Sequence, residues 1–219
     1  MSEFMLGVVS SLLATALTVV GGWAFSLRSR RWPALVLSRL TGLGVLHVLP
    51  RQQLAAQELS AELARARWVR VLAGRGNELT RDSFATVWDA AGKRLESVQV
   101  LLPDTTTGYD SWLSRRESDL RRVDPGFSPG LLAEQVRINA TYVSEITRHH
   151  QPVSLRFYDL PNLHRLVITD NVAYLTMYRQ GEHGRNSPCI VAHRPGVLYD
   201  YALLLFTTAW EHSRPAEAG

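Results

Sequence analysis

The feature that most constrains this chain is an uncharged segment close to its N-terminus. Residues 4–27 carry no charged side chain and are mostly apolar. As a helix with about 1.5 Å rise per residue, they would extend roughly 36 Å, which exceeds a hydrocarbon core of about 30 Å. Arg28, Arg30 and Arg31 follow at once, whereas the preceding flank holds Glu3 and no basic residue. The positive-inside rule therefore predicts a single-pass cell-membrane protein with its N-terminus outside and its main domain in the cytoplasm.

A cleaved signal peptide is the competing interpretation of the same segment. Signal peptides place their positive charge before the apolar stretch, whereas this chain places it afterwards, so we favour an anchor. Within the segment, Ser10, Ala14, Thr18 and Gly22 recur every four residues. On a helix they would form a stripe of small side chains that lets two helices pack closely. We expect a homo-oligomer through this stripe, with chance in a helix rich in small residues as the alternative.

Composition narrows the chemistry of the remaining chain. Cys189 is the single cysteine, so an intramolecular disulfide and a cysteine-rich zinc site are excluded, as fits a reducing compartment. Lys93 is the only lysine among 24 basic residues. The net charge of +4 permits contact with phosphates or anionic lipids without requiring it. We expect no cofactor and no metal, and the balance of charge does not favour nucleic acid as a partner.

Beyond the anchor, strand and helix patterns alternate. We expect an anchor with its basic flank over residues 1–31, a connector over 32–66, an α/β domain over 67–213 and a disordered tail over 214–219. The connector should hold an amphipathic juxtamembrane helix running into a strand at 44–49, and then a helix at 52–67. In the domain the patterns predict strands at 68–73, 97–102, 153–158, 163–169, 172–178 and 189–192, and helices at 79–91, 110–122, 128–149 and 197–212. Asp170 and Asn171 indicate a tight hairpin. The fold class is therefore α/β, a mixed sheet flanked by helices.

The order of these elements, over about residues 66–212, resembles one half of a phospholipase D-like domain. The resemblance implies a catalytic signature H-x-K-x4-D, in which the histidine attacks phosphorus and the lysine holds phosphate oxygens. It also implies that catalysis requires two such histidines, from two halves or two subunits. His164 lies where the signature histidine would be.

The rest of that signature is missing. Leu166 occupies the lysine position, and Asn171 occupies the aspartate position with Asp170 one residue early. None of the seven histidines has a lysine two residues later. The resemblance therefore implies a shared fold with a degenerate site and no catalytic residue, or His164 alone if the protein is enzymatic.

Several residues remain candidates for binding a phosphorylated ligand. Arg75 and Asn77 lie in the Gly-rich loop 74–77 after a predicted strand, and arginine captures phosphate oxygens in bidentate geometry. His164 and Arg165 are neighbours on a strand and must point to opposite faces. The ligand-binding candidates are therefore Arg75, Asn77, His164, Arg165 and Asp170. For each, the alternative is a structural role: a turn for the loop, a core histidine for His164 and a solvated strand residue for Arg165.

Two further carboxylates, Asp104 and Asp159, end predicted strands, where ligand sites of α/β proteins gather. Metal binding and acid–base chemistry at these residues are the weaker interpretation, because strand-end carboxylates are common.

Three functions from different classes follow. The leading hypothesis is a non-catalytic, membrane-anchored module that binds a phosphorylated small molecule or a protein partner and signals through its anchor; a bacterial stress or defence effector is one version. The second is a phosphodiesterase, phospholipase or nuclease of phospholipase D type that uses His164. The third is a structural subunit of a membrane complex.

Overall fold

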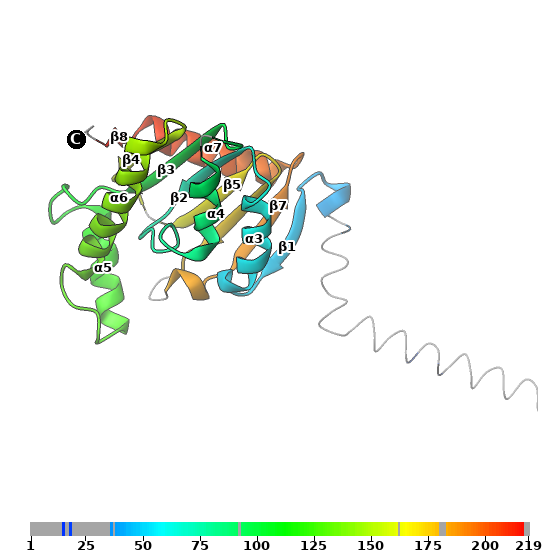
Figure 1. Ribbon diagram of the computed structural model, residues 1–219. Helices are drawn as coiled ribbons and strands as arrows, with labels where there is room; N and C mark the ends of the chain where they lie inside the picture. Colours follow the sequence, from blue (N-terminus) through cyan, green and yellow to red (C-terminus); the bar gives the residue numbers. More distant parts are fainter. Residues whose placement is uncertain are drawn as a thin grey trace, which may run out of the picture. The chain divides into compact units, whose positions relative to one another are not determined.

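A computed structural model describes residues 15, 18, 36, 38–91, 93–161, 163–179 and 183–216 (Figure 1). The chain divides into two compact units, Met1–Leu43 and Gly44–Gly219. In the first unit the described residues before Thr41 are helical, and the Thr18 hydroxyl donates to the Thr15 carbonyl at 3.1 Å.

The predicted anchor lies outside the described residues apart from Thr15 and Thr18, as do Ser10, Ala14 and Gly22 of the small-residue stripe. Where the chain is described, no helix is both long and apolar enough to span a bilayer. The anchor and its orientation stay predictions.

The second unit is an α/β domain. Its strands are β1 (Val45–Leu49), β2 (Trp68–Leu72), β3 (Ser97–Pro103), β4 (Val153–Tyr158), β5 (His164–Thr169), β6 (Val172–Met177), β7 (Cys189–His193) and β8 (Arg214–Pro215). Its helices are η1 (Gln52–Ala55), α3 (Ala56–Leu63), α4 (Asp82–Ala90), α5 (Trp112–Val123), α6 (Leu131–His149), η2 (Gly184–Asn186) and α7 (Val197–Glu211). The predicted elements are confirmed, with boundaries shifted by a few residues.

One mixed sheet joins the strands in the order β1-β7-β6-β5-β2-β3-β4-β8. The strands β2, β3 and β4 run parallel, and every other neighbouring pair is antiparallel. The hairpin predicted at Asp170 and Asn171 joins β5 to β6. Because β5 lies beside β2 in the opposite direction, the start of β5 meets the carboxyl end of β2. That meeting point positions the site described below.

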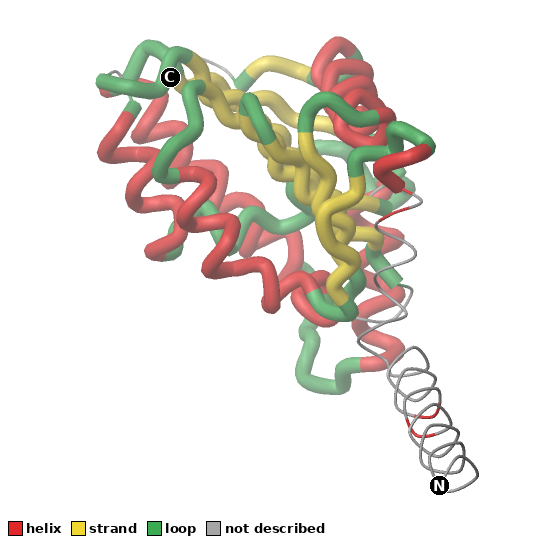
Figure 2. The backbone as a smooth tube through the Cα atoms, turned by 90° about the vertical axis from the view of Figure 1, so that its right-hand side faces the viewer, coloured by secondary structure: helices red, strands yellow, loops and turns green. Residues whose placement is uncertain are grey.

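Helices cover both faces of this sheet (Figure 2). On one face, α3, α4, α5 and α6 pack against a core that includes Val69 and Val71 of β2. On the other face α7 packs against a second core, to which Trp68 and Leu72 of the same strand contribute. The alternation along β2 follows from the period of two in a strand, which sends successive side chains to opposite faces.

The structure changes two predicted boundaries. The compact unit begins at Gly44 and not at residue 67, because β1 pairs with β7 and α3 packs into the core. The tail does not lose order at residue 214. Arg214 and Pro215 form β8 against β4, and the Arg214 side chain binds Asp104. An ion pair between residues far apart in the sequence thus orders part of the segment expected to be a disordered tail.

Candidate functional site

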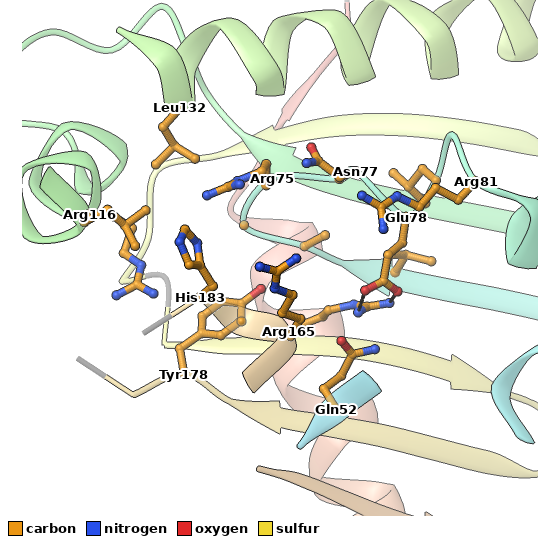
Figure 3. Close-up of a pocket in the computed structure, with 18 of the residues that line it drawn as sticks. Gln52, Arg75, Asn77, Glu78, Arg81, Arg116, Leu132, Arg165, Tyr178 and His183 are labelled. Carbon is orange, nitrogen blue, oxygen red and sulfur yellow. Dashed lines mark hydrogen bonds and ion pairs between the residues drawn. The ribbon is translucent and has the colours of Figure 1, made fainter. Parts of the chain in front are cut away.

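A pocket of about 250 Å³ opens where β2 ends and β5 begins (Figure 3). The loop from β2 to α4 supplies much of its wall, and α5, α6, η1, β5 and the segment after β6 complete it. Arginines at five positions line it: 75, 81, 116, 165 and 185. Glu78 is the single carboxylate among the described lining residues. The pocket therefore has the charge of an anion-binding site.

The Gly-rich loop owes its shape to Gly76 and Asn139. Gly76 has a φ of 82°, and a Cβ there would lie 2.9 Å from Cδ2 of Leu102. Left-handed backbone with no space for a side chain favours glycine. The buried Asn139 of α6 donates through Nδ2 to the Arg75 carbonyl and to Oδ1 of Asn77, both at 2.8 Å. Asn139 therefore holds the loop that presents Arg75 to the pocket.

Arg75 is half-buried and lies among like charges. Its guanidinium lies 5.5 Å from the centre of the Phe127 ring, and no carboxylate forms an ion pair with it within the described part of the chain. Burial lowers the pKa of Arg75, and the nearby charges of Arg116 and Arg185 lower it further, while Tyr178 and the Asp124 carboxylate act in the opposite direction. An arginine remains protonated even so. An anion bound here would relieve both the loss of solvation and the repulsion.

Arg165 has a different environment. Both of its terminal nitrogens donate to the carboxylate of Glu78, in a bidentate pair. The Arg165 side chain is 9% exposed and that of Glu78 is 30% exposed. Arg165 lines the pocket, but its charge is balanced within the chain by Glu78.

Tyr178 and His183 form the wall nearest Arg116. The Arg116 guanidinium lies 5.6 Å from the centre of the Tyr178 ring, and Nε2 of His183 lies 3.2 Å from Oδ2 of Asp124. Burial raises the pKa of Tyr178, so its phenol keeps its proton at neutral pH. Gly184, the next residue after His183, packs closely against the ring of Tyr178, because a Cβ at this position would lie 2.6 Å from Cε1 of the ring.

Two of the predicted ligand residues lie elsewhere. His164 shares its face of β5 with Leu166, which is buried in the core under α7, whereas Arg165 faces the pocket. Burial lowers the pKa of His164, which favours a neutral imidazole. Asp170 follows the far end of β5 and accepts a hydrogen bond from the Arg67 backbone at 2.8 Å. Neither residue lines the pocket, because the pocket lies on one face and at one end of β5.

The strand-end carboxylates serve the fold. Asp104 accepts hydrogen bonds from Arg214 Nε at 3.0 Å and from the Thr106 backbone at 2.9 Å. Asp159 accepts one from the Trp112 backbone at the start of α5, at 2.9 Å. Cys189 is buried, and burial raises the pKa of its thiol. Across the described residues, no group of three or more His, Cys, Asp or Glu is arranged to hold a metal ion.

Sequence reasoning did not identify seven polar side chains of the pocket: Gln52, Glu78, Arg81, Arg116, Tyr178, His183 and Arg185. Arg185 stands two residues after His183, but His212 and Arg214 have the same spacing and do not line the pocket, so this spacing did not single out the site. The seven residues come from elements far apart in the chain and share no local pattern.

No protein family model matches the sequence, and neither does any curated protein. The solved structures that are similar to it in fold include the following three. TrmBL2, an archaeal chromatin protein described with a novel mode of DNA binding, has a TM-score of 0.48 and 11% identity, over 95% of this chain and 70% of that one. Nuc from Salmonella typhimurium, a phospholipase D family member, has a TM-score of 0.46 and 12% identity, over 74% and 91% of the two chains. NucT from Helicobacter pylori has a TM-score of 0.46 and 12% identity, over 78% and 96%.

Proposed function

We propose that the domain binds a small phosphorylated ligand in its arginine-lined pocket without hydrolysing it, and that the N-terminal segment anchors it to the cytoplasmic side of a membrane. The observation that carries the proposal is Arg75, half-buried among Arg116 and Arg185 with no carboxylate partner in the described chain. Like charges held together at a partly buried position favour an anion, and phosphate matches the donor geometry of arginine.

The pocket also lacks what the phospholipase D reaction needs. His164 lies outside it, and Leu166, at the lysine position of the signature, is buried in the core under α7. Attack on a phosphodiester builds negative charge on oxygen, and losing one well-placed donor costs roughly 10²–10³ in rate. His183 is the histidine that lines the pocket, and its Nε2 contacts Asp124. His183 is therefore the first residue to test for any hydrolytic activity.

Ligand binding by the full chain in mild detergent tests the proposal. Titration calorimetry with inorganic phosphate should give saturable binding, and Arg75→Ala should raise the Kd by about 10- to 100-fold, the value of a charge-assisted hydrogen bond. Arg148→Ala is the matched control, because Arg148 forms an exposed pair with Glu145 on α6. Equal phosphate binding by wild type and Arg75→Ala would contradict the proposal.

The enzymatic alternative is tested in the same preparation. We expect no turnover of a model phosphodiester, of phospholipid or of nucleic acid above the background rate. Turnover that disappears in His183→Ala, with the melting temperature unchanged, would replace the binding proposal with a hydrolase. Retention of turnover in His183→Ala but not in His164→Ala would restore the original enzymatic hypothesis.

The anchor belongs to the proposal because of the uncharged segment at residues 4–27. Removing residues 1–31 should move the protein from the membrane pellet to the supernatant at high salt. Continued pelleting of the shortened chain would mean that membrane attachment resides elsewhere. Stable co-purification with another membrane protein, together with no phosphate binding, would instead support a structural subunit.

A further inference from the structure

The pocket has two ends of different character, and their difference points to the ligand. Arg75, Arg116 and His183 gather at one end, while Glu78, Arg81 and Gln52 lie at the other (Figure 3). Among the described residues at the first end, cationic side chains outnumber the carboxylates, of which Asp124 contacts His183. The second combines a carboxylate with the guanidinium of Arg165, which is bound to it.

Glu78 restricts what can occupy the second end. Its carboxylate lines the pocket and is 30% exposed, so it can accept further hydrogen bonds beside those from Arg165. A second phosphate would be repelled by Glu78 although Arg81 and Arg165 would attract it, and an ammonium group would be attracted by Glu78 but repelled by the two arginines. A neutral donor, such as a hydroxyl, meets neither penalty. Gln52 adds a nearly buried amide that can donate and accept.

The size of the pocket limits the ligand further. At about 250 Å³ it lies just below the roughly 300–1,000 Å³ of ordinary ligand pockets. A volume of this size favours a small phosphate ester over a ligand with a long chain. Inorganic phosphate at the first end would leave the remaining acceptor capacity of Glu78 without a donor from the ligand.

We propose, building on the phosphate-binding function above, that the ligand is a phosphate monoester of a sugar, free or as part of a mononucleotide. The phosphate occupies the end formed by Arg75, Arg116 and Arg185. A sugar hydroxyl donates to Glu78 at the opposite end. Glu78 is thus a specificity-determining residue, and Arg165 holds its carboxylate in place.

Ligands that differ in their hydroxyl groups test the proposal on the unmodified full chain. Ribose 5-phosphate should bind at least tenfold more tightly than propyl phosphate, which carries the same phosphate without hydroxyls, because a hydroxyl bonded to a carboxylate is worth about 10-fold or more. Equal affinities of the two esters would overturn the proposal. Adenosine monophosphate distinguishes the two sources: tighter binding than ribose 5-phosphate identifies a mononucleotide, and weaker binding a free sugar phosphate.

Glu78→Gln then locates the preference. The amide still accepts a hydrogen bond from Arg165 but has lost the charge, so the ratio of the two affinities should fall to about one while inorganic phosphate binds as well as before or better. Glu145→Gln, in the exposed pair with Arg148, should leave the ratio unchanged. A ratio that survives Glu78→Gln overturns the role of Glu78. If the variant does not fold, the comparison of esters on the wild type still decides the ligand class.

These outcomes separate the two proposals. In one outcome, propyl phosphate and inorganic phosphate both bind in a way that depends on Arg75, with no gain in affinity from hydroxyl groups. That result would support the phosphate site and reject the sugar. Failure of every phosphate to bind rejects both.

Discussion

The strands β2 and β3 are parallel neighbours that end at the same edge of the sheet, yet their ends differ. After β3, Asp104 is buried and is bound by Arg214 and Thr106. After β2, Arg75 is half-buried and forms no ion pair with a carboxylate of the described chain, although the charge of Asp124 lies near enough to act on it. At the end of β3, the closed strand end, the charge is paired within the chain. The end of β2, the open strand end, leads into the pocket.

The difference shows how to separate structural charges from functional ones in this protein. A buried charge whose partner is supplied by the chain contributes to folding, and its loss leaves that partner unsatisfied. A half-buried charge without such a partner opposes folding until a ligand arrives, which makes it a candidate for binding. By this criterion Asp104 and Arg165 are structural, and Arg75 is the residue expected to bind the ligand.

The largest effect should come from the closed strand end. Asp104→Ala removes the acceptor of Arg214 and Thr106 and should lower the free energy of unfolding by about 2–3 kcal/mol, less than for a fully buried pair because Arg214 is partly exposed. Chemical denaturation measures the loss, and phosphate affinity should stay unchanged. Asp119→Ala, which breaks an exposed pair on α5, is the control and should cost less than about 0.5 kcal/mol. A comparable loss in both variants would remove the distinction.

The same strand end should respond to acid. Burial alone would raise the pKa of Asp104, but hydrogen bonds from Arg214 and Thr106 outweigh it and lower the pKa below its ordinary value. The folded protein therefore binds this proton less readily than the unfolded chain. The stabilisation contributed by the ionised Asp104 carboxylate is fully present above its pKa in the unfolded chain, about 3.9. It is lost as pH falls through the lower pKa of Asp104 in the folded protein. Unfolding measured across this range should show a smaller loss with acid in Asp104→Ala than in wild type.

Asn139 should stabilise the Gly-rich loop at the open strand end. Asn139→Ala leaves the Arg75 carbonyl and Asn77 without their donor and should cost about 1–2 kcal/mol of stability. Because the same hydrogen bonds position the loop, the affinity for phosphate should fall as well. Thr141→Ala on the same helix loses a hydrogen bond to its own turn and is the control. A stability loss without any change in affinity would show that the loop keeps its shape by other means.

The smallest effect on stability should come from Arg75 itself. Arg75→Ala removes a half-buried cation from two neighbouring cations and should change the free energy of unfolding by less than about 0.5 kcal/mol, although it weakens phosphate binding. A ligand-free melting curve and a titration of the same sample measure both quantities. A stability loss as large as that of Asp104→Ala would mean that Arg75 has a structural role and that the two strand ends do not differ.

Local sequence patterns were sufficient to predict the positions of most strands and helices. Strands of alternating or continuous apolar residues, and the turn residues between β5 and β6, have physical causes within a few residues, so their positions could be predicted. The Gly-rich loop and the opposite directions of His164 and Arg165 also followed from local geometry. The tail could not be predicted, because β8 depends on β4 and on an ion pair between residues 104 and 214.

The site needed the tertiary structure. The sequence by itself identified Arg75, Asn77 and Arg165 as candidates, because a loop after a strand and a basic residue on a strand are local features. It could not show which arginine would be balanced, since Glu78 lies 87 residues from Arg165 along the chain. Nor could it show which face of β5 holds the pocket, because that depends on β5 lying beside β2 under α4, α5 and α6. Secondary structure is set by neighbours in sequence, whereas the charge environment of a site is set by neighbours in space, and only folding decides those.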